Sequence, residues 1–268
     1  MLQNMSKQTC DDFSKGHSMQ FATWLEQRMG WRSTKQAWGL APAHQGWWLL
    51  GLSQEASRLM GVHTVQFLSG ELEDDDPLGV SNGLRQSGAI RGVFQGRHRV
   101  SMGLAMDQVV GGVLAIPVGL GSADCEAEVQ LEAARSLDLE PQDISFDWEM
   151  TPLSAGVAEQ QLRWVACTKG SIERFNQCVR RAGWQLASVE PEVQAAQRAA
   201  SCLCGGLSVL LTRPVQDWQF DLALLPDTDV LDTALHSPLT LDTALQEALQ
   251  SPAGPRLVAA GLALKAWT

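Results

Sequence analysis

The heptapeptide at positions 144–150, ISFDWEM, is the part of this sequence that most constrains its fold. Apolar and polar residues alternate strictly along it. Because successive side chains of a β-strand point to opposite faces, the pattern predicts a strand with one buried face and one solvated face. The buried face is expected to carry Ile144, Phe146, Trp148 and Met150. The apolar segment at 162–168 is expected to be the neighbouring strand.

Three segments around this strand have the apolar spacing of helices. In residues 122–137 apolar side chains recur every four positions, and acidic residues in the first turn suit the positive end of the helix dipole. Residues 171–182 end at a glycine, a common helix stop. The apolar side of this second helix, with Phe175 and Val179, is expected to pack on the sheet that contains residues 144–150. A third helix is expected to begin at Pro191.

Short apolar runs elsewhere predict further strands, so the chain is expected to be an α/β or α+β protein. These strands are expected at 47–52, 59–67, 100–106, 109–116, 184–189, 207–211 and 218–225. An apolar helix is expected at 257–267. Glycines and Pro42 interrupt residues 1–45, which are interpreted as an N-terminal extension.

Charge and cysteine usage narrow the class of protein. The formal net charge of the 268-residue chain is −10, which argues against a nucleic-acid partner, since such binding depends on Lys and Arg that neutralise phosphates. The six cysteines lack the paired spacing of zinc sites. Cys125, Cys167 and Cys178 fall on apolar faces and are expected to be reduced core thiols, as in a cytoplasmic protein. The N-terminus lacks the apolar core of a secretory signal.

The sequence is poor in catalytic patterns. The five histidines are scattered, and no GxSxG, GxGxxG or GxxxxGK[ST] motif occurs. Gly119 and Gly121 precede a helix that already carries acidic residues in its first turns, so a loop connection fits them better than a phosphate site. No catalytic residue, cofactor or metal site is therefore predicted.

Four segments between residues 100 and 200 resemble the PilM/HofM family of actin-like pilus proteins. They are SMGLAMDQVVGGVLAIP at 101–117, EVQLEAARSLDLEPQDISFDW at 128–148, VACTKGSIERFNQCVRRAG at 165–183 and VEPEVQAAQRA at 189–199. The sequence GLAL at 261–264 matches a further motif near the family's C-terminus. A relative of this family is the cytoplasmic domain of GspL in type II secretion.

The resemblance implies an actin-like, ribonuclease H-like α/β fold with an inserted small α+β subdomain and a reduced second lobe. The implied division is an extension at 1–45, a main domain at 46–107 and 186–268, and an inserted subdomain at 108–185. In actin-like ATPases a GxDxG turn follows the first strand and handles phosphate. The matching stretch is expected at residues 50–56, LGLSQEA, where Ser53 replaces the acid and Glu55 replaces the second glycine. This departure predicts a lost nucleotide site.

By the same resemblance, the chain is expected to be a scaffold for type IV pilus assembly, or for a competence or type II secretion-like machine. Its expected partner is the N-terminal cytoplasmic tail of a bitopic inner-membrane PilN-like protein, which would hold the chain at the membrane. The groove walls are expected to be the inserted subdomain and the junction at 189–191. Candidate partner contacts are Trp164, Lys169 and Glu190. For each an ordinary structural role is the alternative: core, solvated turn and helix-start acid.

Two other functions remain open from the sequence. One is an actin-like ATPase or kinase-type enzyme with a divergent nucleotide site, and the other is an unrelated α/β binding module. Intact nucleotide binding would favour the first, and the identity of neighbouring genes would separate the second from a pilus scaffold.

Overall fold

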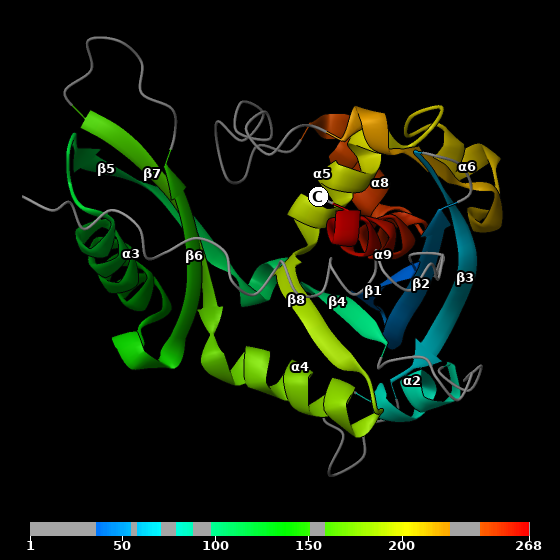
Figure 1. Cartoon of the computed structure of the whole chain (residues 1–268), viewed down its shortest axis with the longest axis horizontal. Coiled ribbons are helices and arrows are strands. Elements are labelled where there is room, and N and C mark those ends of the chain that lie inside the picture. Colours follow the sequence, from blue (N-terminus) through cyan, green and yellow to red (C-terminus); the bar gives the residue numbers. More distant parts are fainter. Residues whose placement is uncertain are drawn as a thin grey trace, which may run out of the picture. The chain divides into compact units, whose positions relative to one another are not determined.

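The chain folds around a six-stranded mixed sheet, described by a computed structural model for residues 36–54, 58–70, 79–87, 98–150, 159–225 and 242–267. The sheet has the order β8-β4-β1-β2-β3-β9, and Figure 1 labels β8, β4, β1, β2 and β3. Its strands are β1 Gln36–Ala43, β2 Gly46–Gln54, β3 Leu59–Ser69, β4 Arg99–Leu104, β8 Gln185–Pro191 and β9 Gln219–Asp221.

The directions of these strands identify the fold class. β1, β2 and β3 form an antiparallel meander, whereas β4 runs parallel to β1 and β8 runs parallel to β4. An antiparallel three-strand meander flanked by two parallel strands, in the order 3-2-1-4-5, is the arrangement of the ribonuclease H-like fold. The α/β fold expected from the sequence is therefore present.

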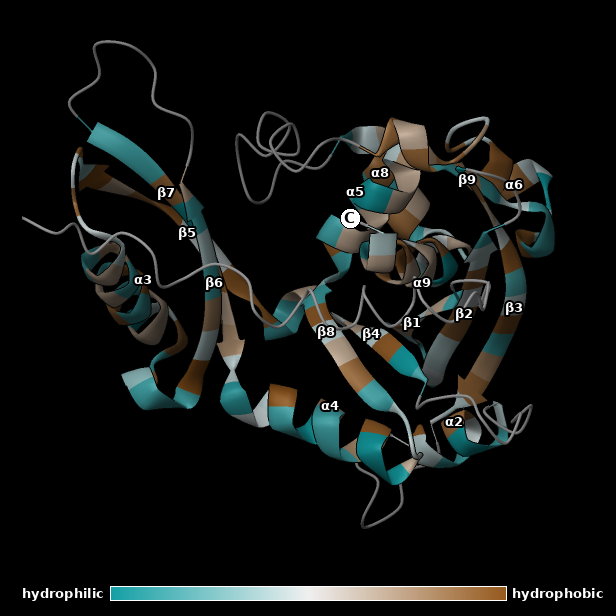
Figure 2. Ribbon diagram, in the orientation of Figure 1, coloured by the Kyte–Doolittle hydropathy of each residue, from teal (hydrophilic) through white to brown (hydrophobic). Residues whose placement is uncertain are grey.

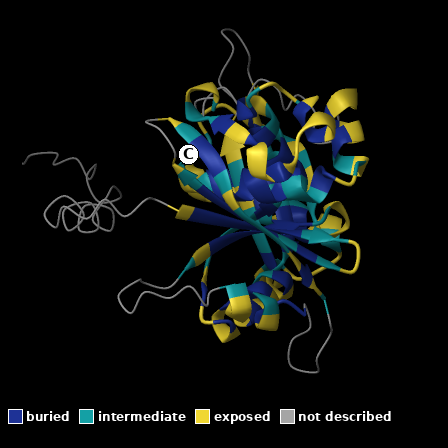
Figure 3. Ribbon diagram, turned by 90° about the vertical axis from the view of Figure 1, so that its right-hand side faces the viewer, coloured by how far each residue is buried: buried dark blue, intermediate teal, exposed yellow. Residues whose placement is uncertain are grey.

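Helices cover both faces of this sheet (Figure 3). One face packs against α5 Glu192–Cys202, α6 Val209–Thr212, α8 Thr243–Gln250 and α9 Gly254–Leu264. The other packs against α2 Ser81–Ser87 and α4 Lys169–Arg181. In the described part of the chain, the segments that follow α5 pack onto this same sheet. They do not build a second lobe.

Residues 110–168 form the inserted subdomain, which holds its own antiparallel sheet in the order β5-β7-β6. The strands are β5 Val110–Pro117, β6 Ile144–Met150 and β7 Glu159–Thr168, and α3 Ser122–Leu137 packs on one face. The alternation at 144–150 is confirmed for Ile144, Phe146 and Trp148, which join this core. Met150 is 45% exposed, so the prediction of its burial is wrong. It lies at the last position of β6.

The N-terminal boundary expected from the sequence is wrong. Residues 36–43 are the central strand β1, so the main sheet begins at Gln36 and not after residue 45. The sequence QAWGLAPA contains a glycine and a proline and is buried on both faces, with Ala37 and Ala41 on one side and Trp38 and Leu40 on the other. Such a strand lacks alternation. The rest of the expected extension, residues 1–35, lies outside the described residues.

Helix α4 belongs to the main domain, which moves the end of the insert from 185 to 168. Phe175 is buried and its ring lies edge-on to Trp47 of β2, with centroids 5.9 Å apart. Val179 joins the same core cluster of the main sheet. The prediction that these residues pack on the insert's sheet is therefore wrong. In Figure 2 the exposed side of α4 is hydrophilic, in keeping with one buried face.

Two of the strands expected in the last third of the chain differ in the structure, and the expected core thiols are present. Residues 207–211 are a turn and the short helix α6, because Gly205 and Gly206 adopt positive φ and reverse the chain there. The strand expected at 218–225 is shortened to β9, of three residues. Cys125, Cys167 and Cys178 are buried free thiols, as predicted.

Replacing Phe175 tests the reassignment of α4. Phe175→Ala should lower the free energy of unfolding by about 3–5 kcal/mol, because a fully buried ring is lost between α4 and β2. Gln177→Ala, at an exposed position of the same helix, is the matched control. Chemical denaturation measures both. Equal stability of the two variants would show that α4 does not pack through Phe175.

Candidate functional site

Three parallel strands, β1, β4 and β8, end at the same edge of the main sheet, the usual place for a ligand in an open α/β sheet. The ends lie close together. A Cβ placed on Gly103 would stand 3.3 Å from Cδ of Pro42 and 3.5 Å from Cγ of Glu192. This edge is therefore where a nucleotide or catalytic site of this fold would have to be built.

A buried ion-pair network occupies part of this edge. Glu190, at 3% exposure, accepts hydrogen bonds from both terminal nitrogens of Arg198, one of them at 2.8 Å, and from Nζ of Lys265 at 3.0 Å. Arg198 also donates to the carbonyl oxygen of Gly261, at 2.9 Å. The buried carboxylate of Glu190 and the buried guanidinium of Arg198 compensate each other, and Lys265, which is 41% exposed, adds a second cation from the surface. The network joins β8, α5 and the C-terminal end of α9.

Two other carboxylates at this edge, those of Glu192 and Asp107, influence each other electrostatically. Burial, together with the nearby charge of Asp107, raises the pKa of Glu192 to about 7. Glu192 opens α5, and Asp107 lies in the turn Met106–Gln108 after β4. Within the described ranges, no group of three or more His, Cys, Asp or Glu side chains is placed to hold a metal ion. Among the described residues, the two cations of the network at this edge, Arg198 and Lys265, are both paired with Glu190.

The turn that corresponds to the first phosphate loop lies earlier in the chain than the sequence analysis expects. Because β1 is the first strand of the described sheet, this turn is the β1–β2 connection at His44 and Gln45. Ser53, in contrast, lies near the end of β2, and Glu55 lies outside the described residues. The assignment of Ser53 and Glu55 to the phosphate turn is therefore wrong. His44 and Gln45 also lack a carboxylate, and Gln45 takes a positive φ of 66°.

The three candidate partner residues do not come together. Trp164 is 7% exposed in the core of the insert, where its ring lies against Gly112. Glu190 is buried in the ion-pair network described above. Lys169 has an exposed side chain that donates to the carbonyl oxygen of Gln142 at 2.6 Å. Contact of these residues with a partner stays a prediction, and Lys169 is the one of the three whose side chain reaches the surface.

A groove runs beside β6 on the insert, a feature that the sequence analysis did not find. Its volume is about 430 Å³. It is lined by Glu126 and Gln130 of α3, residues 144–148 of β6, and Lys169. Two side chains hold the end of the groove where β6 begins. Gln130 donates to the carbonyl oxygen of Pro141, and Lys169 donates to that of Gln142. The alternating pattern of ISFDWEM predicts the strand but not its position at a sheet edge.

Comparison with known proteins gives matches to solved structures alone. No family model matches the chain, and no curated protein matches its sequence. A PilM–PilN type IV pilus biogenesis complex is similar over 64% of this chain and 54% of the other, with 14% identity and a TM-score of 0.46. The cytoplasmic domain of EpsL, an inner-membrane component of the type II secretion system of Vibrio cholerae, is similar over 60% and 59%, with 15% identity and a TM-score of 0.41. The chain thus spans between half and two thirds of these structures' length. Both are of the kinds named by the sequence resemblance.

The raised pKa of Glu192 predicts a pH-dependent stability. Because the folded-state pKa lies above the ordinary value of 4.5, the folded protein holds this proton more tightly, and stability falls as pH rises from about 4.5 to about 7. Glu192→Gln should therefore stabilise the protein at pH 8 by on the order of 1–3 kcal/mol and have little effect at pH 5. Thermal melts at the two pH values measure this. Glu247→Gln, at an exposed position on α8, is the control. A Glu192→Gln effect that is the same at both pH values would contradict the assignment.

Proposed function

We propose that this chain is a non-enzymatic scaffold of a type IV pilus machine, or of a related competence or type II secretion-like machine. In this proposal it binds the N-terminal cytoplasmic tail of a bitopic, PilN-like inner-membrane protein and is held at the membrane by that partner. The observation that carries the proposal is the inserted subdomain, a three-stranded sheet with one helix and a groove of about 430 Å³ beside β6.

The position of the insert supports this proposal. It lies between β4 and α4, within the stretch of sequence that resembles PilM and HofM proteins. The sheet into which it is inserted has the ribonuclease H-like strand order that actin-like proteins share. No helix in the described ranges is long and apolar enough to cross a bilayer.

Charge also favours a membrane-proximal tail. Cytoplasmic segments next to membrane spans are enriched in Lys and Arg. Residues 109–168 of this chain contain ten acidic and two basic side chains, a formal charge of −8 out of the −10 of the whole chain. This concentration would speed the encounter with a basic tail and select against acidic ones.

The alternative of an actin-like ATPase or kinase is less well supported. A nucleotide at the carboxyl edge of the parallel strands would bring its phosphates toward Asp107 and Glu192. Arg198 and Lys265, the cations closest to this edge in the network, already bind Glu190. The β1–β2 turn at His44 and Gln45 also lacks the acidic residue of the family's phosphate turn.

The scaffold proposal predicts saturable binding of the partner's tail. A synthetic peptide of the N-terminal tail of the PilN-like protein encoded beside this chain should bind in a fluorescence titration and weaken as salt rises. The control is the same peptide with its Lys and Arg replaced by Glu. Absence of saturable binding to the folded chain would contradict the scaffold proposal.

The absence of an enzymatic nucleotide site is tested separately. Isothermal calorimetry with ATP and magnesium is expected to give no binding heat at millimolar nucleotide, because the β1–β2 turn has no carboxylate to hold a metal–phosphate group. A micromolar dissociation constant would instead support the ATPase alternative.

A further inference from the structure

Strand β6 has a free edge in the part of the chain that the structure describes. It lies at the end of the order β5-β7-β6, and within the described residues β7 alone pairs with it. The backbone N–H of Trp148 donates to the carboxylate of Asp147 at 2.9 Å, so this group points away from β7. Because backbone groups alternate in direction along a strand, Phe146 and Ile144 also direct their N–H and C=O groups to the open side.

The groove described above follows this free edge, with α3 as its opposite wall. Phe146 and Trp148 are partly buried against the insert's core and give the groove apolar surface. Gln130 and Lys169 hold the end of the groove where β6 begins. An extended segment in this position would find backbone partners along β6 and room for alternate side chains toward α3.

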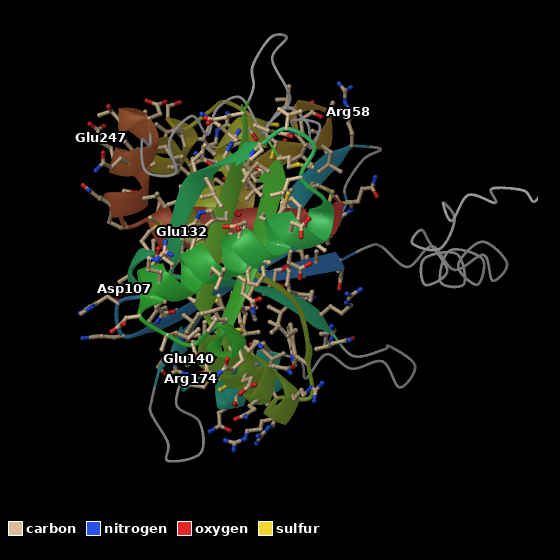
Figure 4. The ribbon with its side chains drawn as sticks, turned by 90° about the vertical axis from the view of Figure 1, so that its left-hand side faces the viewer. Arg58, Asp107, Glu132, Glu140, Arg174 and Glu247 are labelled. Carbon is tan, nitrogen blue, oxygen red and sulfur yellow. The ribbon has the colours of Figure 1, made fainter. Side chains whose placement is uncertain are left out.

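The acidic residues around the groove specify the charge of such a segment. Glu126 of α3 and Asp147 of β6 line it. The wider surface of the insert is acidic as well, and Figure 4 shows two of its carboxylates, Glu132 on α3 and Glu140 after it. An exposed acid on an edge strand deters pairing with a second copy of the same acidic edge. The same charges attract a strand that carries Lys or Arg.

We propose that an extended, basic peptide binds this chain by adding as a fourth strand to the free edge of β6. Its Lys or Arg side chains contact Glu126 and Asp147. This inference rests on the proposed function and names where and how the tail is held. It places the tail in the groove that Lys169 lines, away from Glu190, whose carboxylate is fully engaged inside the main domain.

Three variables of one titration test this binding mode, with the tail peptide of the PilN-like protein as the probe. Glu126→Lys should weaken binding about five- to tenfold, through lost attraction and added repulsion. The control Glu128→Lys makes the same charge change at an exposed position of the same helix, two residues away and therefore on another side. It should change affinity less than twofold, because solvent and salt screen a charge that does not contact the peptide. N-methylation of alternate backbone positions of the peptide should abolish binding in one register and leave the other intact.

Hydrogen exchange supplies the structural readout. With bound peptide, the amides of Ile144 and Phe146 should become protected from exchange. Saturable binding without this protection, and with equal effects of Glu126→Lys and Glu128→Lys, would overturn strand addition at β6 and leave the scaffold proposal standing. No binding at all would contradict both. Protection that grows with protein concentration in the absence of peptide would identify a second copy as the occupant and also overturn the proposal.

Discussion

The close approach of α9 to β1 and α5 is the constraint on which the main domain depends. A Cβ on Gly39 of β1 would lie 2.0 Å from the carbonyl oxygen of Ala259, and one on Gly261 of α9 would lie 1.7 Å from that of Ala195. Both distances are far below any van der Waals contact, so each position accepts glycine alone. From residue 257 to residue 264 every residue of α9 is buried. The helix is therefore a part of the core that covers the centre of the sheet.

This packing also sets the charge arrangement at the end of the parallel strands. It brings the carbonyl oxygen of Gly261 to Arg198, and it carries Lys265 to Glu190. Removing one member of such a network leaves a buried charge uncompensated, which is costly. The basic groups of this edge thus serve to hold β8, α5 and α9 together.

The sequence predicts elements well where one face is buried and one is solvated. Helix α3 matches the expected residues 122–137, because its apolar residues recur along a single side. Strand β1 could not be found in this way, since small and apolar residues face both helical layers. Amphipathicity also shows that Phe175 is buried without showing against which sheet. The groove beside β6 depends on the order of the strands in the sheet, which no local pattern of residues contains. Glu190 could not be placed either, because acidic residues usually lie at the surface and this one is buried by its ion pairs with Arg198 and Lys265.

The central claim is that the insert, and not the edge of the main sheet, is the functional surface. A structure of the chain bound to the partner's tail tests it most directly. We expect the tail to form a fourth strand beside β6, with a basic side chain at Glu126. A tail bound at the ends of β1, β4 and β8, next to Asp107 and Glu192, would contradict it.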